Sequence, residues 1–258
     1  MPRRTGLRDA SLRLISRVRH HLAASFVFDP KPQAMRGYER IGHEVLLRDG
    51  SNLSSVLFGL HKNGLAGREI LDSLFEYIRC VPEESYSKFE FVETQLSDVM
   101  LGLREQDSGP LTDARLLSDG TLRALAVLTA VATSREGSRV VVEEFDNGLH
   151  PSRVSALIAA IAEMGDRRNV KVVLTTHNPV TLDSLTEDQH QGVILAFRSL
   201  KDGSSQLRRL VNLPRHDELL ERGTLGGLVT RRIVDQYVAD DLDQTRAERM
   251  RRWLEAHG

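Results

Sequence analysis

Two adjacent carboxylates, Glu143 and Glu144, follow a run of apolar β-branched residues near the middle of the sequence. The run, residues 140–142, is typical of a buried parallel strand, and the carboxyl ends of such strands lie at the sheet edge where ligands bind. A second apolar run, residues 170–176, ends at His177. Parallel strands share an edge, so we expect the glutamates and the histidine to meet there and to carry the chemistry.

Each residue also has an ordinary structural interpretation. A glutamate at a strand end is usually solvated, and a histidine before Asn-Pro more often belongs to a turn than to a catalytic site. A third stretch, Ser-Asp-Gly-Thr at 118–121, precedes a long apolar helix. Unpaired amides and the positive dipole end at such a helix start suit phosphate, with a plain N-cap as the alternative. The occurrence of all three stretches together favours a functional site.

The sequence between these stretches predicts the elements that position them. Pro151 begins a helix to about residue 164, so strand, helix and strand alternate as in a parallel sheet. The other predicted elements are a helix at 9–24, a non-helical connector at 29–32, a turn at 49–52 with a capping residue, helices from 53 and over about 66–80, a hairpin of strands 89–92 and 99–103, a loop at 105–113, strands at 192–197 and 206–210, and helices at about 226–239 and 242–256.

Composition sets wider limits. The 258 residues are 40% hydrophobic and 28% charged, which is typical of a globular protein. The net charge of −1 gives no general attraction to nucleic acid. A single cysteine, Cys80, excludes an internal disulfide, and no apolar run reaches the roughly 20 residues that cross a bilayer. The N-terminus lacks the apolar region of a secretory signal, so we expect a cytoplasmic location without membrane contact.

Four stretches, in this order, resemble motifs of ABC-type ATPases. They are residues 118–121 for the signature motif, 140–144 for the Walker B strand, 147–151 for the D-loop, and 174–177 for the switch histidine. The sequence is similar to the RecF-like, SMC-related group of predicted bacterial AAA ATPases, many with roles in phage defence or DNA repair. Further likeness at residues 29–36, 50–53 and 225–226 extends the resemblance over about residues 26–230.

The resemblance implies an α/β fold, that of the C-terminal lobe of an ABC-type ATPase. We expect a mostly parallel sheet flanked by helices, with an edge hairpin and C-terminal helices, as a single lobe over residues 1–258. Its parts would be a helical and hairpin portion at 26–115, a core with the signature, Walker B and switch-histidine motifs at 116–200, and a C-terminal portion at 201–258.

The resemblance also implies ATP and Mg²⁺ as cofactors, with a role for each matching residue. Glu143 would hold Mg²⁺, Glu144 would be the general base that orients the attacking water, and His177 would contact the γ-phosphate. Residues that would bind nucleotide or lie beside it at a dimer interface are Ser118, Gly120, Thr121, Asp146, Asn147 and Gly148. Asp119 replaces a glycine of the family, and we expect its carboxylate to cap the helix rather than face phosphate.

One motif is missing from the printed sequence. Phosphate-loop ATPases use Gly-x-x-x-x-Gly-Lys-Ser/Thr, whose amides and lysine cradle the phosphates, and none of the five lysines here follows a glycine. Three explanations are open: a split ATPase with the Walker A motif on a partner chain, a truncated chain, and a non-catalytic relative. The only Asp-x-Asp, residues 241–243, falls between predicted helices, which disfavours a nuclease within the chain.

We therefore predict an ATP-binding and ATP-hydrolysing lobe that dimerises around nucleotide and needs a Walker A motif from another segment or chain. Expected partners are a second copy or a different subunit, with an effector nuclease and nucleic acid as further candidates. The alternative is a non-hydrolysing interaction or scaffold subunit that keeps the lobe for assembly.

Overall fold

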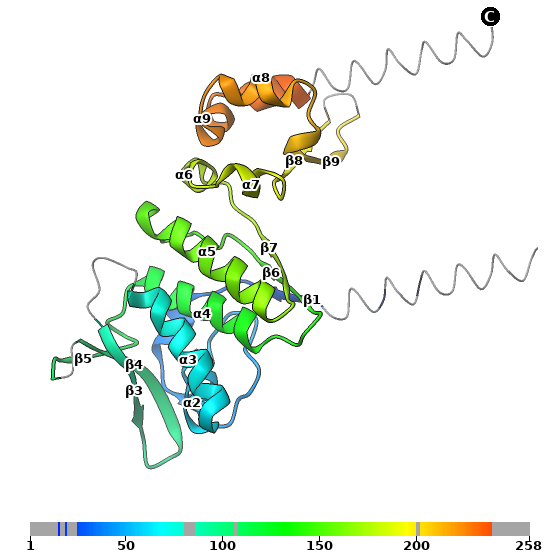
Figure 1. The fold of residues 1–258 in the computed structure, drawn as a ribbon. Coiled ribbons are helices and arrows are strands. Elements are labelled where there is room, and N and C mark those ends of the chain that lie inside the picture. The colour runs from blue at the N-terminus through cyan, green and yellow to red at the C-terminus, as the bar shows by residue number, and fades with distance from the viewer. Residues whose placement is uncertain are drawn as a thin grey trace, which may run out of the picture. The chain divides into compact units, whose positions relative to one another are not determined.

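The computed structural model describes residues 15, 19, 25–79, 86–105, 108–199 and 202–238. Ile15 and Arg19 are helical and exposed, but the rest of the predicted helix at 9–24 lies outside the described residues, as do the helix at 242–256 and the acidic pair at 241–243. The chain forms two compact units, Met1–His177 and Asn178–Gly258 (Figure 1). The prediction of a single lobe stays a prediction.

The first unit contains a three-stranded parallel sheet in the order β1-β6-β7 (Figure 1). Its strands are β1 (Ser25–Phe28), β6 (Arg139–Val142) and β7 (Lys171–Leu174). Phe28, Val140 and Val142 are fully buried. Helices α4 (Asp119–Thr133) and α5 (Pro151–Arg167) pack on each other and contact β6 and β7 respectively. This confirms the predicted α/β class, with a parallel sheet flanked by helices.

The other sheet of this unit is antiparallel and carries the predicted hairpin. Its strands are β2 (Glu39–Arg40), β3 (Tyr86–Glu93), β4 (Asp98–Glu105) and β5 (Leu111–Asp113). Helices α2 (Leu53–Lys62) and α3 (Gly64–Arg79) pack here, with Phe58 edge-on to Phe91 and Phe75 edge-on to Phe89, each pair 5.4 Å between ring centroids. Helix α4 contacts α2, α3 and α5, and its residues 120–132 are all buried, so it forms the centre of this unit.

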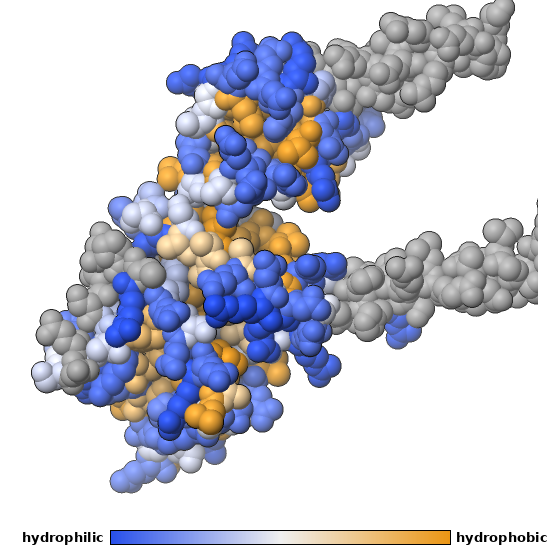
Figure 2. Space-filling view, viewed as in Figure 1, coloured by the Kyte–Doolittle hydropathy of each residue, from blue (hydrophilic) through white to orange (hydrophobic). Residues whose placement is uncertain are grey.

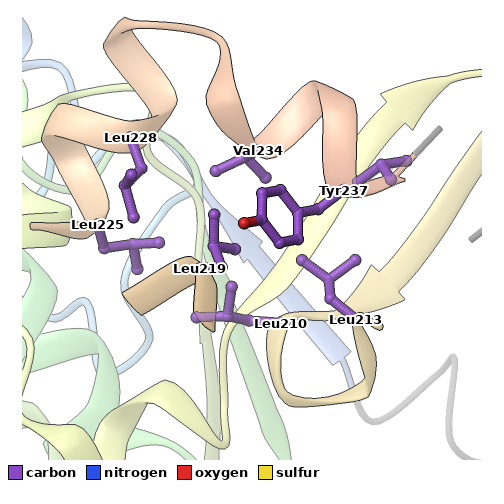
Figure 3. Close-up of a cluster of buried hydrophobic side chains, with 8 residues drawn as sticks. Leu210, Leu213, Leu219, Leu225, Leu228, Val234 and Tyr237 are labelled. Atoms are coloured by element: carbon purple, nitrogen blue, oxygen red, sulfur yellow. The ribbon is translucent and has the colours of Figure 1, made fainter. Parts of the chain in front are cut away.

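The second unit is built around its own apolar cluster. Its elements are α6 (Pro179–Asp183), α7 (Glu187–His190), β8 (Ile194–Arg198), β9 (Ser205–Arg209), the 3₁₀ helix η2 (Leu210–Asn212), α8 (His216–Glu221) and α9 (Leu225–Thr230), and residues 233–238 are also helical. Strands β8 and β9 form the predicted antiparallel hairpin. Figure 3 shows the cluster, in which the labelled side chains are Leu210, Leu213, Leu219, Leu225, Leu228, Val234 and Tyr237.

Four local predictions were wrong. Residues 111–113, predicted as loop, form β5 because Leu111 and Thr112 pair with Arg104 and Leu103. The helix predicted over 226–239 is interrupted where Arg232 has a φ of 58°, which a helix does not accommodate. The other two errors concern helix starts. The 3₁₀ helix η1 (Pro32–Arg36) begins inside the predicted connector, and the Asn52 side chain does not cap α2 but bonds the backbone of Leu47 and Val45.

Hydrophilic residues cover most of the molecular face shown in Figure 2, with hydrophobic residues in smaller patches among them. Within the described part of the chain, the helices are too short or too polar to cross a membrane.

Candidate functional site

Glu143 and Glu144 follow β6 directly, at the carboxyl edge of the parallel sheet. The Glu143 amide donates to the Phe28 carbonyl at 3.0 Å, which extends the pairing of β6 with β1 by one residue. The Glu143 side chain is half exposed, and its Oε1 lies 3.7 Å from Nη2 of Arg48. Glu143 is therefore an accessible carboxylate, and its ion pair with Arg48 is long and solvent-exposed.

Glu144 has a φ of 45°, a left-handed conformation that is uncommon for residues other than glycine. Its backbone is held on both sides. The amide donates to Thr175 Oγ1 at 3.0 Å, and the carbonyl accepts from the Asn147 amide at 3.0 Å and from Nη1 of Arg123 at 3.3 Å. These bonds fix the direction in which the carboxylate leaves the chain.

The Glu144 carboxylate faces His177. Oε1 of Glu144 lies 3.7 Å from Nδ1 of His177, and Oε2 accepts from Nδ2 of Asn147 at 3.4 Å. Both side chains are open to solvent, with 54% exposure for Glu144 and 83% for His177. The structure thus brings Glu144 and His177, both predicted to belong to the site, together on an accessible edge of the sheet.

The start of α4 packs against the turn that follows β6. Ser118 is the N-cap, and its Oγ accepts from the Thr121 amide at 3.0 Å. A Cβ on Gly120 would lie 3.0 Å from the Gly148 carbonyl oxygen, so a larger residue would require this backbone to shift by a few tenths of an ångström. Gly148 itself has a φ of 77°. The signature-like stretch and the D-loop-like stretch are therefore in direct contact.

Asp119 does not cap the helix, contrary to the prediction. Its Oδ1 accepts from Nη2 of Arg36 at 2.5 Å, whereas Ser118 supplies the cap. Ser118 is the capping residue because it occupies the extended position before the first helical residue. From there its short side chain reaches the amide three residues further along the chain. Asp119 is one residue too late for this geometry.

The predicted interface residues differ in exposure. Asp146 is 5% exposed and accepts from Thr176 Oγ1 at 2.7 Å, so its carboxylate faces inward. Asn147 and Gly148 are exposed, and Thr121 is 4% exposed beneath the α4 cap.

Sequence reasoning missed the arginines that organise this region. Nη1 of Arg36 donates to the carbonyls of Ala114, Arg115 and Leu117 at 3.0, 2.7 and 2.8 Å, which holds the loop before α4. Arg123 is only 8% exposed, and burial lowers the pKa of its guanidinium, while nearby carboxylates act in the opposite direction. In sequence these arginines resemble the many solvated ones, so no local pattern marks them.

The donors present suit Mg²⁺ held partly by substrate. Within the described residues, no group of three or more histidine, cysteine or acidic side chains could form a metal cage. Mg²⁺ in phosphoryl-transfer sites is commonly held by one or two carboxylates together with phosphate oxygens and water. The exposed Glu143 carboxylate fits such a site. At the start of α4, the Ser118 side chain bonds the Thr121 amide and does not bond the amides of Asp119 and Gly120.

Comparisons with solved structures give low overall similarity. A chain from "Structural biochemistry of ATP-driven dimerization and DNA stimulated activation of SMC ATPases" has 13% identity and a TM-score of 0.42, covering 60% of this chain and 91% of that one. An Smc head domain from Pyrococcus yayanosii has 15% identity and a TM-score of 0.38, and one from Pyrococcus furiosus has 17% and 0.37. Each covers 60% of this chain, which spans 29% and 38% of those two chains.

The comparison with curated proteins gives no match. A family model described as "AAA domain, putative AbiEii toxin, Type IV TA system" matches residues 3–183, which is more than half of the chain and includes every predicted site residue. The chain therefore belongs to this family of AAA domains.

Proposed function

We propose that this chain is a catalytic lobe of an ATP hydrolase, completed by a phosphate-binding loop from another segment or chain. The observation that carries the proposal is the 3.7 Å approach of Glu144 Oε1 to His177 Nδ1, at the sheet edge where Glu143 is also exposed. Two carboxylates and an imidazole, side chains suited to holding a metal ion, orienting water and contacting phosphate, follow two adjacent strands. Membership of the AAA family supports nucleotide as the ligand.

In this proposal each side chain has one task. Glu144 accepts a proton from the attacking water and orients it, His177 donates a hydrogen bond to the terminal phosphate, and Glu143 holds Mg²⁺. The ion, when bound, neutralises charge on the phosphate oxygens. Ser118, which is exposed, contacts nucleotide held by a second subunit, and Asn147 and Gly148 lie at that interface. Gly120 is buried, and its task is to let the turn with Gly148 pack against the start of α4. Because Asp146 faces inward, its task is to hold the turn that carries Asn147.

The sheet supports the need for a further segment. The register places Val27, Val141 and Val173 side by side on one face, and Val27 and Val173 are 37% and 45% exposed. Parallel sheets normally have both faces covered. Among the described strands, β7 also has a neighbour on one side only. A strand added beside β7 would bring a phosphate-binding loop next to His177, and ATP binding by the chain alone should be weak.

The biological setting is part of the same proposal. Assembly as a homo- or hetero-oligomer, an effector nuclease as partner, contact with nucleic acid, and a role in DNA repair or phage defence follow from the resemblance to RecF-like and SMC-related ATPases. The cytoplasm is the proposed compartment.

The test is phosphate release from ATP by this chain mixed with a chain that supplies the Walker A motif. We expect Glu144→Gln to lower kcat by about 10²–10⁴-fold, because the general base is lost, while ATP binding is retained. Glu163→Gln removes an exposed glutamate on α5 and is the matched control. If the active complex is indifferent to Glu144→Gln, the catalytic assignment is wrong. If no activity arises with any Walker A chain while a stable complex forms, the scaffold alternative is correct.

A further inference from the structure

Arg123 is a buried cation behind the site and is not among the residues proposed to contact water, Mg²⁺ or nucleotide. It lies in the second turn of α4, is 8% exposed, and its Nε has no hydrogen-bond partner among the described residues. Four acidic residues act on its charge through space, namely Asp29, Glu144, Asp119 and Asp146. Burying a guanidinium with an unpaired donor is costly, so a purely structural core would favour an apolar residue here.

The hydrogen bond that Arg123 makes is directed at the backbone. Nη1 donates to the carbonyl oxygen of Glu144 at 3.3 Å, although the carboxylate of the same residue could accept a stronger bond. The Glu144 carboxylate is thereby left free to face His177. A bond from a charged donor to this carbonyl opposes rotation of the peptide that follows Glu144.

The conformation of Glu144 needs such support. Its φ of 45° is disfavoured by contact between Cβ and the backbone, and a return to the ordinary region would redirect the side chain. The hydrogen bond from the Glu144 amide to Thr175 Oγ1 holds the amide side of the residue. The hydrogen bonds that its carbonyl accepts from Asn147 and Arg123 hold the other side. Of these donors, only Arg123 comes from α4.

We propose that Arg123 is a positioning residue that holds Glu144 in its left-handed conformation and links the start of α4 to the base. Ser118 and Gly120 precede it on the same helix. A ligand that moves the start of α4 therefore changes the restraint on the Glu144 carbonyl. The catalytic consequence rests on the proposed function, but the restraint itself is a property of the chain alone.

The first experiment measures amide hydrogen exchange in the full-length chain without nucleotide. We expect Arg123→Met to speed exchange in residues 144–147 by about tenfold or more relative to the rest of the first unit, because the restraint is lost. Arg123→Lys retains a charged donor and should recover part of the protection. Leu157→Ala, a fully buried position on α5, is the control for general destabilisation and should raise exchange across the unit without singling out this turn.

Protection of residues 144–147 that is unchanged in Arg123→Met, or changed equally by Leu157→Ala, overturns the proposal. If the methionine variant does not fold, Arg123→Gln decides, because it keeps a polar side chain but loses the charge and the reach of the guanidinium: protection equal to that of wild type would overturn the proposal, and a selective loss at residues 144–147 would support it.

The second experiment uses the complex with a Walker A chain. Arg123→Met should lower kcat at least tenfold and leave KM for ATP within about twofold, with partial recovery in Arg123→Lys. A change in KM alone would contradict a role in positioning the base. The two proposals fail separately: Glu144→Gln without effect removes the proposed function, whereas exchange results unaffected by Arg123→Met remove the positioning role.

Discussion

Gly120 shows how one absent side chain brings two parts of the site together. A Cβ at this position would meet the Gly148 carbonyl oxygen at 3.0 Å and Leu149 Cδ2 at 3.2 Å. Both neighbours belong to the turn that follows Glu144, so any larger residue must push this turn away from α4. The sequence motifs assign both stretches to the nucleotide site or its dimer interface but do not predict that they touch within one chain.

Replacing Gly120 by alanine tests this contact. We expect Gly120→Ala to destabilise the first unit by about 1–3 kcal/mol, because overpacking outweighs the gain in helix propensity. Gly59→Ala is the control: it is also helical, its Cβ would meet its nearest neighbour at 3.7 Å, and it should stabilise by up to about 1 kcal/mol. Urea unfolding of both variants is the measurement, and equal shifts would show that the contact is absent.

A second prediction at this scale concerns pH. The Arg104 guanidinium bonds both carboxylate oxygens of Glu90 and lowers the pKa of that group from 4.5 to about 2. A depressed pKa stabilises the fold fully above the ordinary value, and this contribution is lost as pH falls from about 4.5 towards 2. We expect Glu90→Gln to be less stable than wild type by about 1 kcal/mol or less at pH 6, since solvent screens the pair.

The difference in stability between Glu90→Gln and wild type should shrink between pH 4.5 and pH 2, as measured by urea midpoints. Glu163→Gln removes an exposed i,i+4 ion pair with Arg167 on α5 and serves as the control for loss of an ordinary surface ion pair. A difference that stays constant over this range would mean that the ion pair with Arg104 does not stabilise the fold.

At the scale of elements, α4 depends on how it begins. The Ser118 side chain caps the first turn of this helix by accepting a hydrogen bond from the Thr121 amide. We expect Ser118→Ala to cost about 1 kcal/mol in unfolding free energy. Ser73→Ala within α3 is the control, since Ser73 only bonds the carbonyl four residues back and alanine is the better helix former. Calorimetry of both variants would show a loss for Ser118→Ala alone.

Which elements the sequence could predict follows from their physics. Strands β6 and β7 and helix α5 were predictable because a continuous apolar run or a proline start marks them locally. Strand β5 was not, because three residues become a strand only when β4 lies beside them. The helix break near Arg232 rests on a single backbone angle, which arginine does not signal.

For the whole molecule, the two units have separate cores. Leu228 is 2% exposed in the cluster of the second unit, and Leu157 is fully buried in the first. We expect Leu228→Ala to destabilise the second unit by about 2–4 kcal/mol and to leave amide exchange in α4 unchanged. Leu157→Ala is the reciprocal control. Exchange that rises equally in both units after either substitution would show a single cooperative fold.

The sequence also predicted where the site lies but not what supports it. Strands β6 and β7 run parallel, so their carboxyl ends lie at the same edge of the sheet. Glu143, Glu144 and His177 follow these ends and therefore lie at that edge. The supporting arginines at 36, 48 and 123 come from segments that are distant in sequence from their partners, so their contacts depend on packing that no local pattern encodes.

The sheet face formed by Val27, Val141 and Val173 is partly exposed, and this has a consequence during protein synthesis. A newly synthesised chain would expose these apolar side chains and, among the described strands, the unpaired edge of β7. Exposed edge strands promote association with other chains. Expression of this chain alone should therefore favour aggregation. On the proposal that a further strand pairs with β7, co-expression of the segment that carries this strand should raise the yield of unaggregated protein.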